Sequence, residues 1–215
     1  MNYYLNATYR RKILDALLDA NKEYLFGNVL DIGGGRHRGK FKRPKINSWI
    51  SADIEENLHP DVVCDVQDMH LEKESFDSIK ATELFEHVEN PELGLKECCR
   101  VLKKGGYMVI SAPFFFPIHS APHDYQRWTE YKWRVELKKA GFEIEQLVVM
   151  GRYFTVLSDT VKVFVRSLPR FIKYFCYISY PALDLLTRLD SLRAVKEHKY
   201  LGECTTGYFM VVKKI

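Results

Sequence analysis

The segment VLDIGGG (residues 29–35) constrains the fold of this chain more than any other stretch. An apolar pair is followed by an acid and then by three consecutive glycines, the pattern of a buried parallel strand that ends in a tight turn. Glycine accepts a positive φ, and its missing Cβ lets a ligand approach the backbone. In open α/β sheets, ligands bind at the carboxyl ends of the strands. The segment therefore predicts a ligand-binding turn at the edge of a sheet.

Further strand and helix patterns alternate along the chain. We expect strands near residues 49–54, 61–66, 76–81, 107–112, 142–149 and 206–213. Helices are expected near 8–24, 91–102 and 129–140, with Gly105 and Gly106 ending the second of these. This order predicts an α/β fold with a Rossmann-like, mostly parallel, seven-stranded sheet. Its last strand is expected to run antiparallel, inserted beside the sixth.

Composition places the chain among globular proteins. Its 215 residues suit one domain, and 47% apolar content supplies a full core. The net charge of +4 does not by itself indicate nucleic acid. Five cysteines form no metal-ligand pattern and suit reduced thiols. No secretory signal and no membrane-spanning run is visible, so we expect a cytoplasmic protein.

The residues after the glycines help to identify the ligand. Asp53 follows Gly33 by 20 positions, where a carboxylate can accept hydrogen bonds from two ribose hydroxyls. The dinucleotide fingerprint requires a third glycine where this chain has Arg38, and a helix directly afterwards. Residues 36–45 are basic and contain Pro44, which predicts a loop. NAD is therefore disfavoured, and the loop is either solvated or a clamp for an anionic substrate.

Seven short segments in this order resemble the class I S-adenosylmethionine (SAM)-dependent methyltransferases, in particular the type 11 group. They are VLDIGGG, ADI, CDVQDM, SFDSI, TELFEHV, RVLKKGG and AGF, and the resemblance covers residues 29–151 and the terminal strand. It implies SAM as cofactor and S-adenosylhomocysteine as product. The implied contacts are with the methionine part (Asp31, Gly33, Gly34, Gly35), the ribose (Asp53, Ile54) and the adenine (Asp65, Val66). The resemblance also implies a single methyltransferase domain. We expect this domain to comprise an N-terminal helix in 1–28, a SAM-binding core in 29–151, a helical insertion in 152–200 and a terminal strand in 201–215.

Acceptor residues should follow the fourth and fifth strands, because methyl transfer requires alignment of the acceptor and removal of a proton. The motif Glu83-x-x-Glu86-His87 follows the fourth strand. A comparable motif binds a divalent metal, together with a further histidine, in a few class I methyltransferases, and His119 or His123 could supply that ligand here. The same motif is frequent in type 11 members without a metal role. We expect no metal and keep a metal-assisted methyltransferase as an alternative.

The segment PHDYQRWT (residues 122–129) follows the fifth strand and resembles the loop signature of one type 11 subgroup. His123 is the expected general base, because histidine titrates near neutrality. Asp124 could orient His123 or act in its place, while Tyr125 and Arg127 could position the substrate. Glu83 and His87 are further catalytic candidates. The alternative is a structural lid held by Asp124 and Arg127.

The insertion is basic and aromatic. Residues 152–199 hold nine Lys or Arg against four acids, and residues 171–180 are rich in aromatic side chains. These features suit peripheral contact of residues 153–192 with an anionic membrane, at the inner membrane face, or a cover over a lipid-like acceptor. A dimer interface or a plain helical cap is equally compatible.

These features together predict a SAM-dependent methyltransferase acting on a small-molecule, sugar or lipid-linked acceptor, at oxygen. The sugar or glycolipid acceptor is implied by the subgroup resemblance alone. A non-catalytic SAM-fold scaffold is the alternative of another class. A nucleic-acid substrate is not expected, because Thr82 and Glu83 stand where a base-flipping motif would follow the fourth strand.

Overall fold

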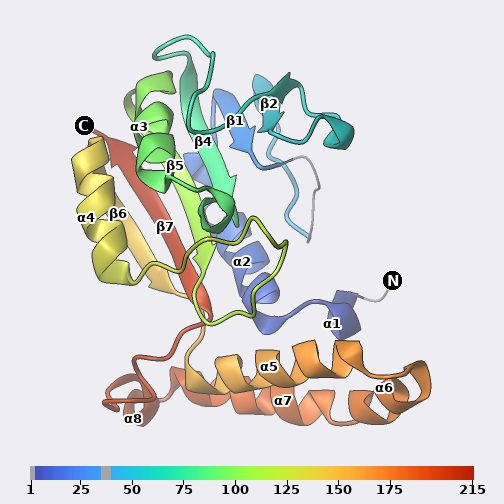
Figure 1. The fold of residues 1–215 in the computed structure, drawn as a ribbon. Coiled ribbons are helices and arrows are strands. Elements are labelled where there is room, and N and C mark those ends of the chain that lie inside the picture. The colour runs from blue at the N-terminus through green and yellow to red at the C-terminus, as the bar shows by residue number, and fades with distance from the viewer. Residues whose placement is uncertain (1–2, 35–39) are drawn as a thin grey trace.

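The computed structural model describes residues 3–34 and 40–215. Their strands form one sheet of seven, in the order β3-β2-β1-β4-β5-β7-β6 (Figure 1). The parallel strands are β1 (Asn28–Ile32), β2 (Ser48–Asp53), β3 (Val62–Val63), β4 (Phe76–Thr82) and β5 (Leu102–Pro113). Strand β7 (Gly207–Lys214) lies between β5 and β6 (Phe142–Val149) and is antiparallel to both. The predicted fold class is confirmed, including the inserted antiparallel strand.

Strand β1 lies at the point where the strand order reverses. It pairs with β2 on one side and with β4 on the other, and its residues from Val29 onward are buried. A strand that is covered on both faces needs the continuous apolar run that this segment carries. Ligands of such sheets bind in the crevice at this reversal, outside the carboxyl ends of the strands. The glycine turn after β1 therefore lies at the ligand-binding edge.

Helices cover both faces of the sheet. On one face, α3 (Pro91–Val101) and α4 (Glu130–Ala140) enclose the larger apolar core (Figure 1). On the other, α2 (Tyr9–Ala20) contributes Leu14 and Leu18 to a second core. Both α2 and α4 are capped at their N-termini, since the hydroxyl oxygen of Thr8 accepts from the Arg11 amide and that of Thr129 from the Lys132 amide.

Some predicted boundaries were wrong. Helix α3 ends at Val101, before the glycines at 105 and 106, because the buried Leu102 pairs with Phe76 and begins β5. The expected helix over 8–24 is divided into α2 and a 3₁₀ turn at Lys22–Tyr24, with a short α1 (Tyr3–Asn6) ahead of it. Strand β3 spans only two residues.

The segment after β6 forms a helical platform beyond the carboxyl ends of the parallel strands. It consists of α5 (Tyr153–Ser167), α6 (Arg170–Tyr177), α7 (Tyr180–Arg188) and α8 (Arg193–Lys196), with α5 and α7 side by side (Figure 1). Within the described residues, no helix has the length and apolarity needed to cross a membrane.

Buried charges fix this platform to the N-terminal helices. The Asp159 carboxylate accepts hydrogen bonds from the backbone amides of Tyr9 and Arg10, at 2.5 and 3.0 Å. The Lys162 ammonium donates to the carbonyl oxygens of Tyr4 and Ala7, at 3.0 and 2.6 Å. The Asp159 bonds satisfy amides at the start of α2 that have no partner within the helix, and the Lys162 bonds satisfy carbonyl oxygens just before it. The platform is thus joined to the helix that carries Arg10 toward the ligand-binding edge.

Candidate functional site

A cavity of about 720 Å³ opens at the carboxyl edge of the sheet. Its wall brings together segments that are far apart in sequence: the turn after β1, the ends of β2 and β4, and the loop after β5. Most of the predicted site residues lie on this wall, namely Gly33, Gly34, Asp53, Ile54, Asp65, Val66, Glu83, His87, His123 and Tyr125. The size suits a cofactor or small-molecule site.

Asp31 lies directly beneath the cavity and is only 1% exposed. Its carboxylate accepts from the Lys80 ammonium at 2.7 Å and from the Trp49 indole N–H at 3.1 Å. The Arg43 guanidinium lies 3.9 Å away. A buried carboxylate needs such partners, because burial of an unpaired charge is costly. Asp31 is therefore held in one orientation below the glycine turn.

The glycine turn is shaped by close neighbours. Gly33 has a φ of 72°, a conformation that side chains other than glycine rarely adopt. A Cβ at Gly34 would lie 2.5 Å from the carboxyl carbon of Asp31. Both positions thus require glycine for reasons that the fold itself supplies. Gly35, predicted with them, lies outside the described residues.

Two acids follow β2 and β3 on the cavity wall. Asp53 ends β2, and its Oδ1 accepts from the Glu55 amide at 3.1 Å. Asp65 accepts from the Gln67 amide at 2.8 Å and from its side chain at 2.9 Å. Ile54 is an exposed apolar side chain beside Asp53. The wall therefore offers carboxylate acceptors next to an apolar surface.

Glu83 is held at the end of β4 with a φ of 55°, an uncommon conformation for this residue type. Its carboxylate pairs with the Arg10 guanidinium and accepts from the Ser111 hydroxyl at 3.0 Å. Burial lowers the pKa of Arg10 to about 10. This ion pair links α2 to the floor of the site, so Glu83 is a stabilised anion rather than an available base.

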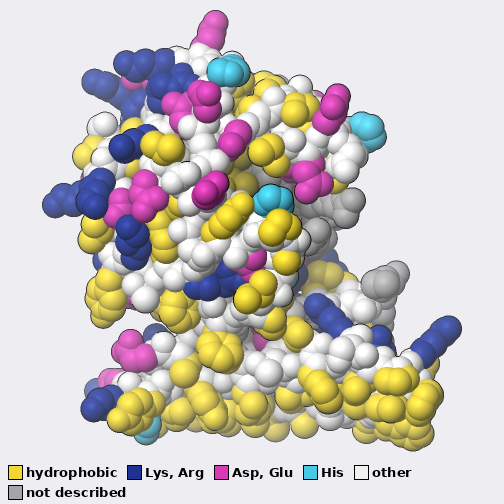
Figure 2. All heavy atoms as spheres, in the orientation of Figure 1, with side chains coloured by type: hydrophobic (Ala, Val, Ile, Leu, Met, Phe, Trp, Pro, Cys, Tyr) yellow, Lys and Arg dark blue, Asp and Glu magenta, His cyan; other side chains and the backbone are white. Residues whose placement is uncertain are grey.

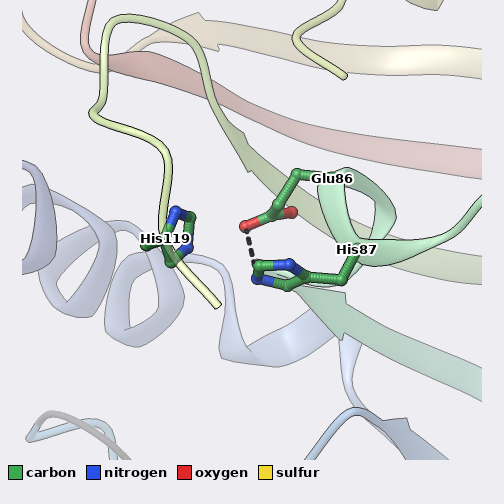
Figure 3. A group of neighbouring side chains, drawn as sticks. All are labelled: Glu86, His87 and His119. Atoms are coloured by element: carbon green, nitrogen blue, oxygen red, sulfur yellow. Dashed lines mark ion pairs between the residues drawn. The ribbon is translucent and has the colours of Figure 1, made fainter. Parts of the chain in front are cut away.

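Glu86 and His87 lie one turn further on, in a 3₁₀ segment at Phe85–His87. His119, from the loop after β5, lies beside them (Figure 3). The rings of His87 and His119 are 4.8 Å apart, centre to centre. Burial raises the pKa of Glu86, and burial together with the neighbouring His87 lowers the pKa of His119.

The loop after β5 separates its polar residues into two groups. His123 and Tyr125 lie on the cavity wall, with the Tyr125 hydroxyl 3.0 Å from His123 Nδ1. Asp124 points elsewhere: it pairs with Arg127 at 2.5 and 2.8 Å and accepts from the His119 amide at 2.8 Å. The Arg127 guanidinium holds the pKa of Asp124 well below its usual range. Asp124 and Arg127 thus fix the loop, while His123 and Tyr125 face the cavity.

Several residues of the site were missed by sequence reasoning. Lys80 and Trp49 hold Asp31, and Arg10 holds Glu83. Lys80 could have been found, because a lysine inside an otherwise apolar buried strand requires an anionic partner. Arg10 carried no such signal, since its partner comes from a distant part of the chain.

A second hollow, of about 770 Å³, lies between α2, β6 and the helical platform. Its wall includes Lys12, Arg152 and Arg188. It is wide open, and no site residue predicted above lines it within the described part of the chain. The chemistry of the chain is therefore concentrated at the first cavity.

The comparison with protein families gives one match. Residues 32–110, which run from the end of β1 into β5, match the family model described as the methyltransferase domain of type 11. This stretch of the chain resembles the type 11 methyltransferase domain, as the sequence predicts. SAM is the cofactor that this family implies.

Solved structures that resemble the methyltransferase domain share its fold at low sequence identity. A SAM-dependent methyltransferase from Archaeoglobus fulgidus is 17% identical, with a TM-score of 0.56 over 95% of this chain and 94% of that one. The partner of the Trm112 methyltransferase activator in a Haloferax volcanii complex is also 17% identical, with a TM-score of 0.52 and 94% and 92% covered. The [4+2]-cyclase SpnF is 17% identical, with a TM-score of 0.57 and 93% and 81% covered. No curated protein sequence matches the chain.

Proposed function

We propose that the protein transfers a methyl group from SAM to a hydroxyl oxygen of a small-molecule, sugar or lipid-linked acceptor. One observation carries the proposal: a single cavity joins the glycine turn and two acids of the methyltransferase domain to the His123–Tyr125 pair. The cavity thus has a cofactor half, lined by the glycine turn and the two acids, and an acceptor half, lined by His123 and Tyr125. The bound SAM supplies an activated methyl group on its sulfonium, and the protein has to align the acceptor and take up a proton.

The residues present fit the cofactor. Gly33 and Gly34 leave the turn without side chains, so the methionine part of SAM can approach the backbone above Asp31. We assign the ribose hydroxyls to Asp53, beside Ile54, because a carboxylate accepts from paired hydroxyls. We assign the adenine to Asp65 and Val66, which line the same wall. By continuity of the turn, we assign Gly35 to the methionine part as well.

The acceptor half is assigned to the loop after β5. His123 takes the proton of the acceptor hydroxyl, and Tyr125 holds its ring through the 3.0 Å contact. His87, also on the wall, positions the acceptor. Asp124 and Arg127 position the loop, and Glu83 positions it from below through Arg10.

Cofactor binding is tested by calorimetry with SAM and S-adenosylhomocysteine. The wild type is expected to bind both, and Asp53→Ala to weaken binding by at least about 10-fold, since a hydrogen bond to a charged group contributes roughly 1.5–3 kcal/mol. Asp68→Ala is the matched control, because Asp68 is a highly exposed acid near β3 and does not line the cavity. Absence of binding by the folded wild type would refute the proposal.

The lipid-linked acceptor and a peripheral position at the inner, cytoplasmic face of a membrane form one further part of the proposal. Figure 2 shows apolar side chains gathered along the outer face of the platform, over α6 and α7. The exposed apolar side chains of α6, α7 and the turn between them are Phe171, Tyr174, Phe175, Ile178 and Leu185. Residues 160–183 contain no acid and four Lys or Arg, of which Lys162 is buried against Tyr4 and Ala7 and the other three are not. Apolar and cationic groups on one face suit an anionic lipid surface.

The membrane contact is tested by flotation with vesicles of anionic or neutral lipid. A Phe171→Ser/Phe175→Ser variant should lose binding to anionic vesicles, because each buried Phe contributes about 1.5–3 kcal/mol. Tyr131→Ser is the control, since Tyr131 on α4 is as exposed (69%) as Phe175 (74%). Equal flotation of the Phe variant, or a concentration-dependent homodimer that the Phe substitutions dissociate, would contradict the membrane contact. The Phe substitutions leave the buried hydrogen bonds of Asp159 and Lys162 to the N-terminal segment intact. Deletion of residues 153–192 would remove those bonds.

A non-catalytic scaffold remains the second candidate. A protein of the same fold is described as a [4+2]-cyclase rather than a methyltransferase, so the fold by itself does not establish methyl transfer. SAM binding and methyl transfer therefore need separate measurements. Transfer of label from methyl-labelled SAM to a lipid or saccharide fraction distinguishes them, and binding without transfer, in His123→Ala and wild type alike, would favour the scaffold.

A further inference from the structure

Glu86 presents a buried carboxylate without a hydrogen-bond partner. The residue is 2% exposed, and neither carboxylate oxygen accepts a hydrogen bond from the described residues. His87 Nε2 lies 3.7 Å from Oε1 (Figure 3). A buried anion without donors is unfavourable, so it requires a cation or a proton.

Each neighbouring imidazole has its Nδ1 facing an acceptor. Nδ1 of His87 lies 2.6 Å from the carbonyl oxygen of His123. Nδ1 of His119 lies 3.3 Å from Oδ2 of Asp124 and 3.3 Å from the carbonyl oxygen of Pro117. In both rings Nδ1 is therefore the protonated nitrogen, and Nε2 keeps a lone pair. Metal-binding histidines are held in the same way, by an acceptor on the nitrogen that does not bind the metal.

Among the described residues, Arg10 and Arg127 attract the Glu86 charge from a distance, but no Lys or Arg forms an ion pair with it. The two arginines nearest to it already pair with other carboxylates, Arg10 with Glu83 and Arg127 with Asp124. Arg11, the third cation of the region, lies 3.9 Å from Glu83. The cluster therefore combines one unpaired negative charge with two neutral nitrogen donors.

We propose that Glu86, His87 and His119 bind a divalent transition-metal cation. One ligand atom from each residue lies within 4.8 Å of the other two. Bonds of about 2.0–2.2 Å place two ligand atoms of one ion at most roughly 4.4 Å apart, so binding requires a contraction of a few tenths of an ångström. One carboxylate and two imidazoles suit Mn²⁺, Fe²⁺, Co²⁺ or Zn²⁺ rather than Ca²⁺ or Mg²⁺. Glu83 is not a ligand, because its carboxylate is engaged by Arg10.

The position of the cation relates this site to the proposed function. His87 is shared between the cluster and the cavity wall, so a cation here borders the acceptor half of the cavity. Three protein ligands leave coordination positions for an acceptor oxygen, whose hydroxyl pKa a divalent cation lowers. This consequence rests on the proposed function, whereas cation binding itself does not.

The test is a titration of metal-free protein with Mn²⁺, in which electron paramagnetic resonance measures the free ion. A parallel titration with Co²⁺ reports the type of ligand through the absorbance spectrum. The wild type should bind one ion per chain. Glu86→Gln and His119→Gln should each weaken binding by more than about 10-fold. His70→Gln is the control, because His70 is an exposed histidine beside an acid, Asp68, outside the cluster.

The thermal stability of the metal-free variants shows whether the substitutions act only by disturbing the fold. Without metal, Glu86→Gln should not lower the thermal stability, because the neutral amide avoids the desolvation that raises the pKa of Glu86. No uptake of Mn²⁺ or Co²⁺ by the folded wild type would overturn the proposal, as would unchanged affinity in both cluster variants. Calorimetry with SAM in the presence of a chelator distinguishes the two proposals. SAM binding without cation binding would refute the metal site alone, whereas absence of SAM binding would refute the proposed function.

Discussion

The pair formed by Asp31 and Lys80 provides the sharpest test of how the site is built. Both side chains are almost fully buried, at 1% and 9% exposure, and the ammonium donates to Oδ1 at 2.7 Å. Replacement of Lys80 with Met conserves the shape of the side chain and leaves the Asp31 carboxylate buried with the Trp49 indole N–H and a guanidinium 3.9 Å away. Removal of one partner of a buried pair costs about 3–5 kcal/mol.

We expect the lower part of that range, about 3–4 kcal/mol, because Trp49 and Arg43 remain. For a chain of this length the melting temperature should fall by roughly 6–16 °C, at about 2–4 °C per kcal/mol. The double variant Asp31→Asn/Lys80→Met removes both charges and should recover most of the loss. The assay is urea unfolding at neutral pH without SAM.

The exposed pair of Lys103 and Asp77 is the matched control. It has the same 2.7 Å distance, but the lysine is 43% exposed. Lys103→Met should cost less than about 1 kcal/mol, because water screens the interaction. The pair does not stabilise the floor of the site if Lys80→Met lowers the unfolding free energy no more than this control. The same conclusion follows if the losses caused by the Asp31 and Lys80 substitutions simply add.

Two further outcomes can be measured on the same preparations. Gly34→Ala should abolish SAM binding and destabilise the fold by about 1–3 kcal/mol, because its Cβ would overlap the Asp31 carboxyl group, whereas Gly105→Ala, with no neighbour within 4 Å, should bind SAM normally. Retained binding in Gly34→Ala, measured by calorimetry, would contradict this. Because Arg127 depresses the pKa of Asp124 in the folded state, the pair stabilises the fold above about pH 4, and this stability is lost as the pH falls below the pKa of an unfolded Asp. The melting temperature should therefore fall less between pH 5 and pH 2 for Asp124→Asn than for the wild type. An equal fall in both proteins would argue against the pair.

The fold was largely predictable because its signals are local. The apolar run before the glycines, the Thr caps at 8 and 129 and the turn at Gly141 each depend on neighbours in the sequence. The start of β5 was misplaced because Leu102 pairs with Phe76 in the sheet, a contact between distant residues that starts the strand before the glycines.

The candidate site was predicted residue by residue but not as an arrangement. The motif Glu83-x-x-Glu86-His87 indicates two equivalent acids, yet the structure gives them opposite surroundings. Glu83 pairs with Arg10 from α2, while the Glu86 carboxylate accepts no hydrogen bond from the residues that the structure describes. No spacing in the sequence indicates which acid an arginine more than 70 residues away will neutralise.

The sequence by itself determined the class of the fold and the resemblance to type 11 methyltransferases, because strand and turn signals recur at short, fixed separations along the chain. The tertiary structure alone decided which charges are paired and which are not. Electrostatic pairing depends on distance in space and on burial, and both are set only when α2, β4 and the loop after β5 come together. The glycine turn could be predicted from the sequence, whereas the buried Lys80 beneath it and the unpaired Glu86 beside it appear only in the assembled fold.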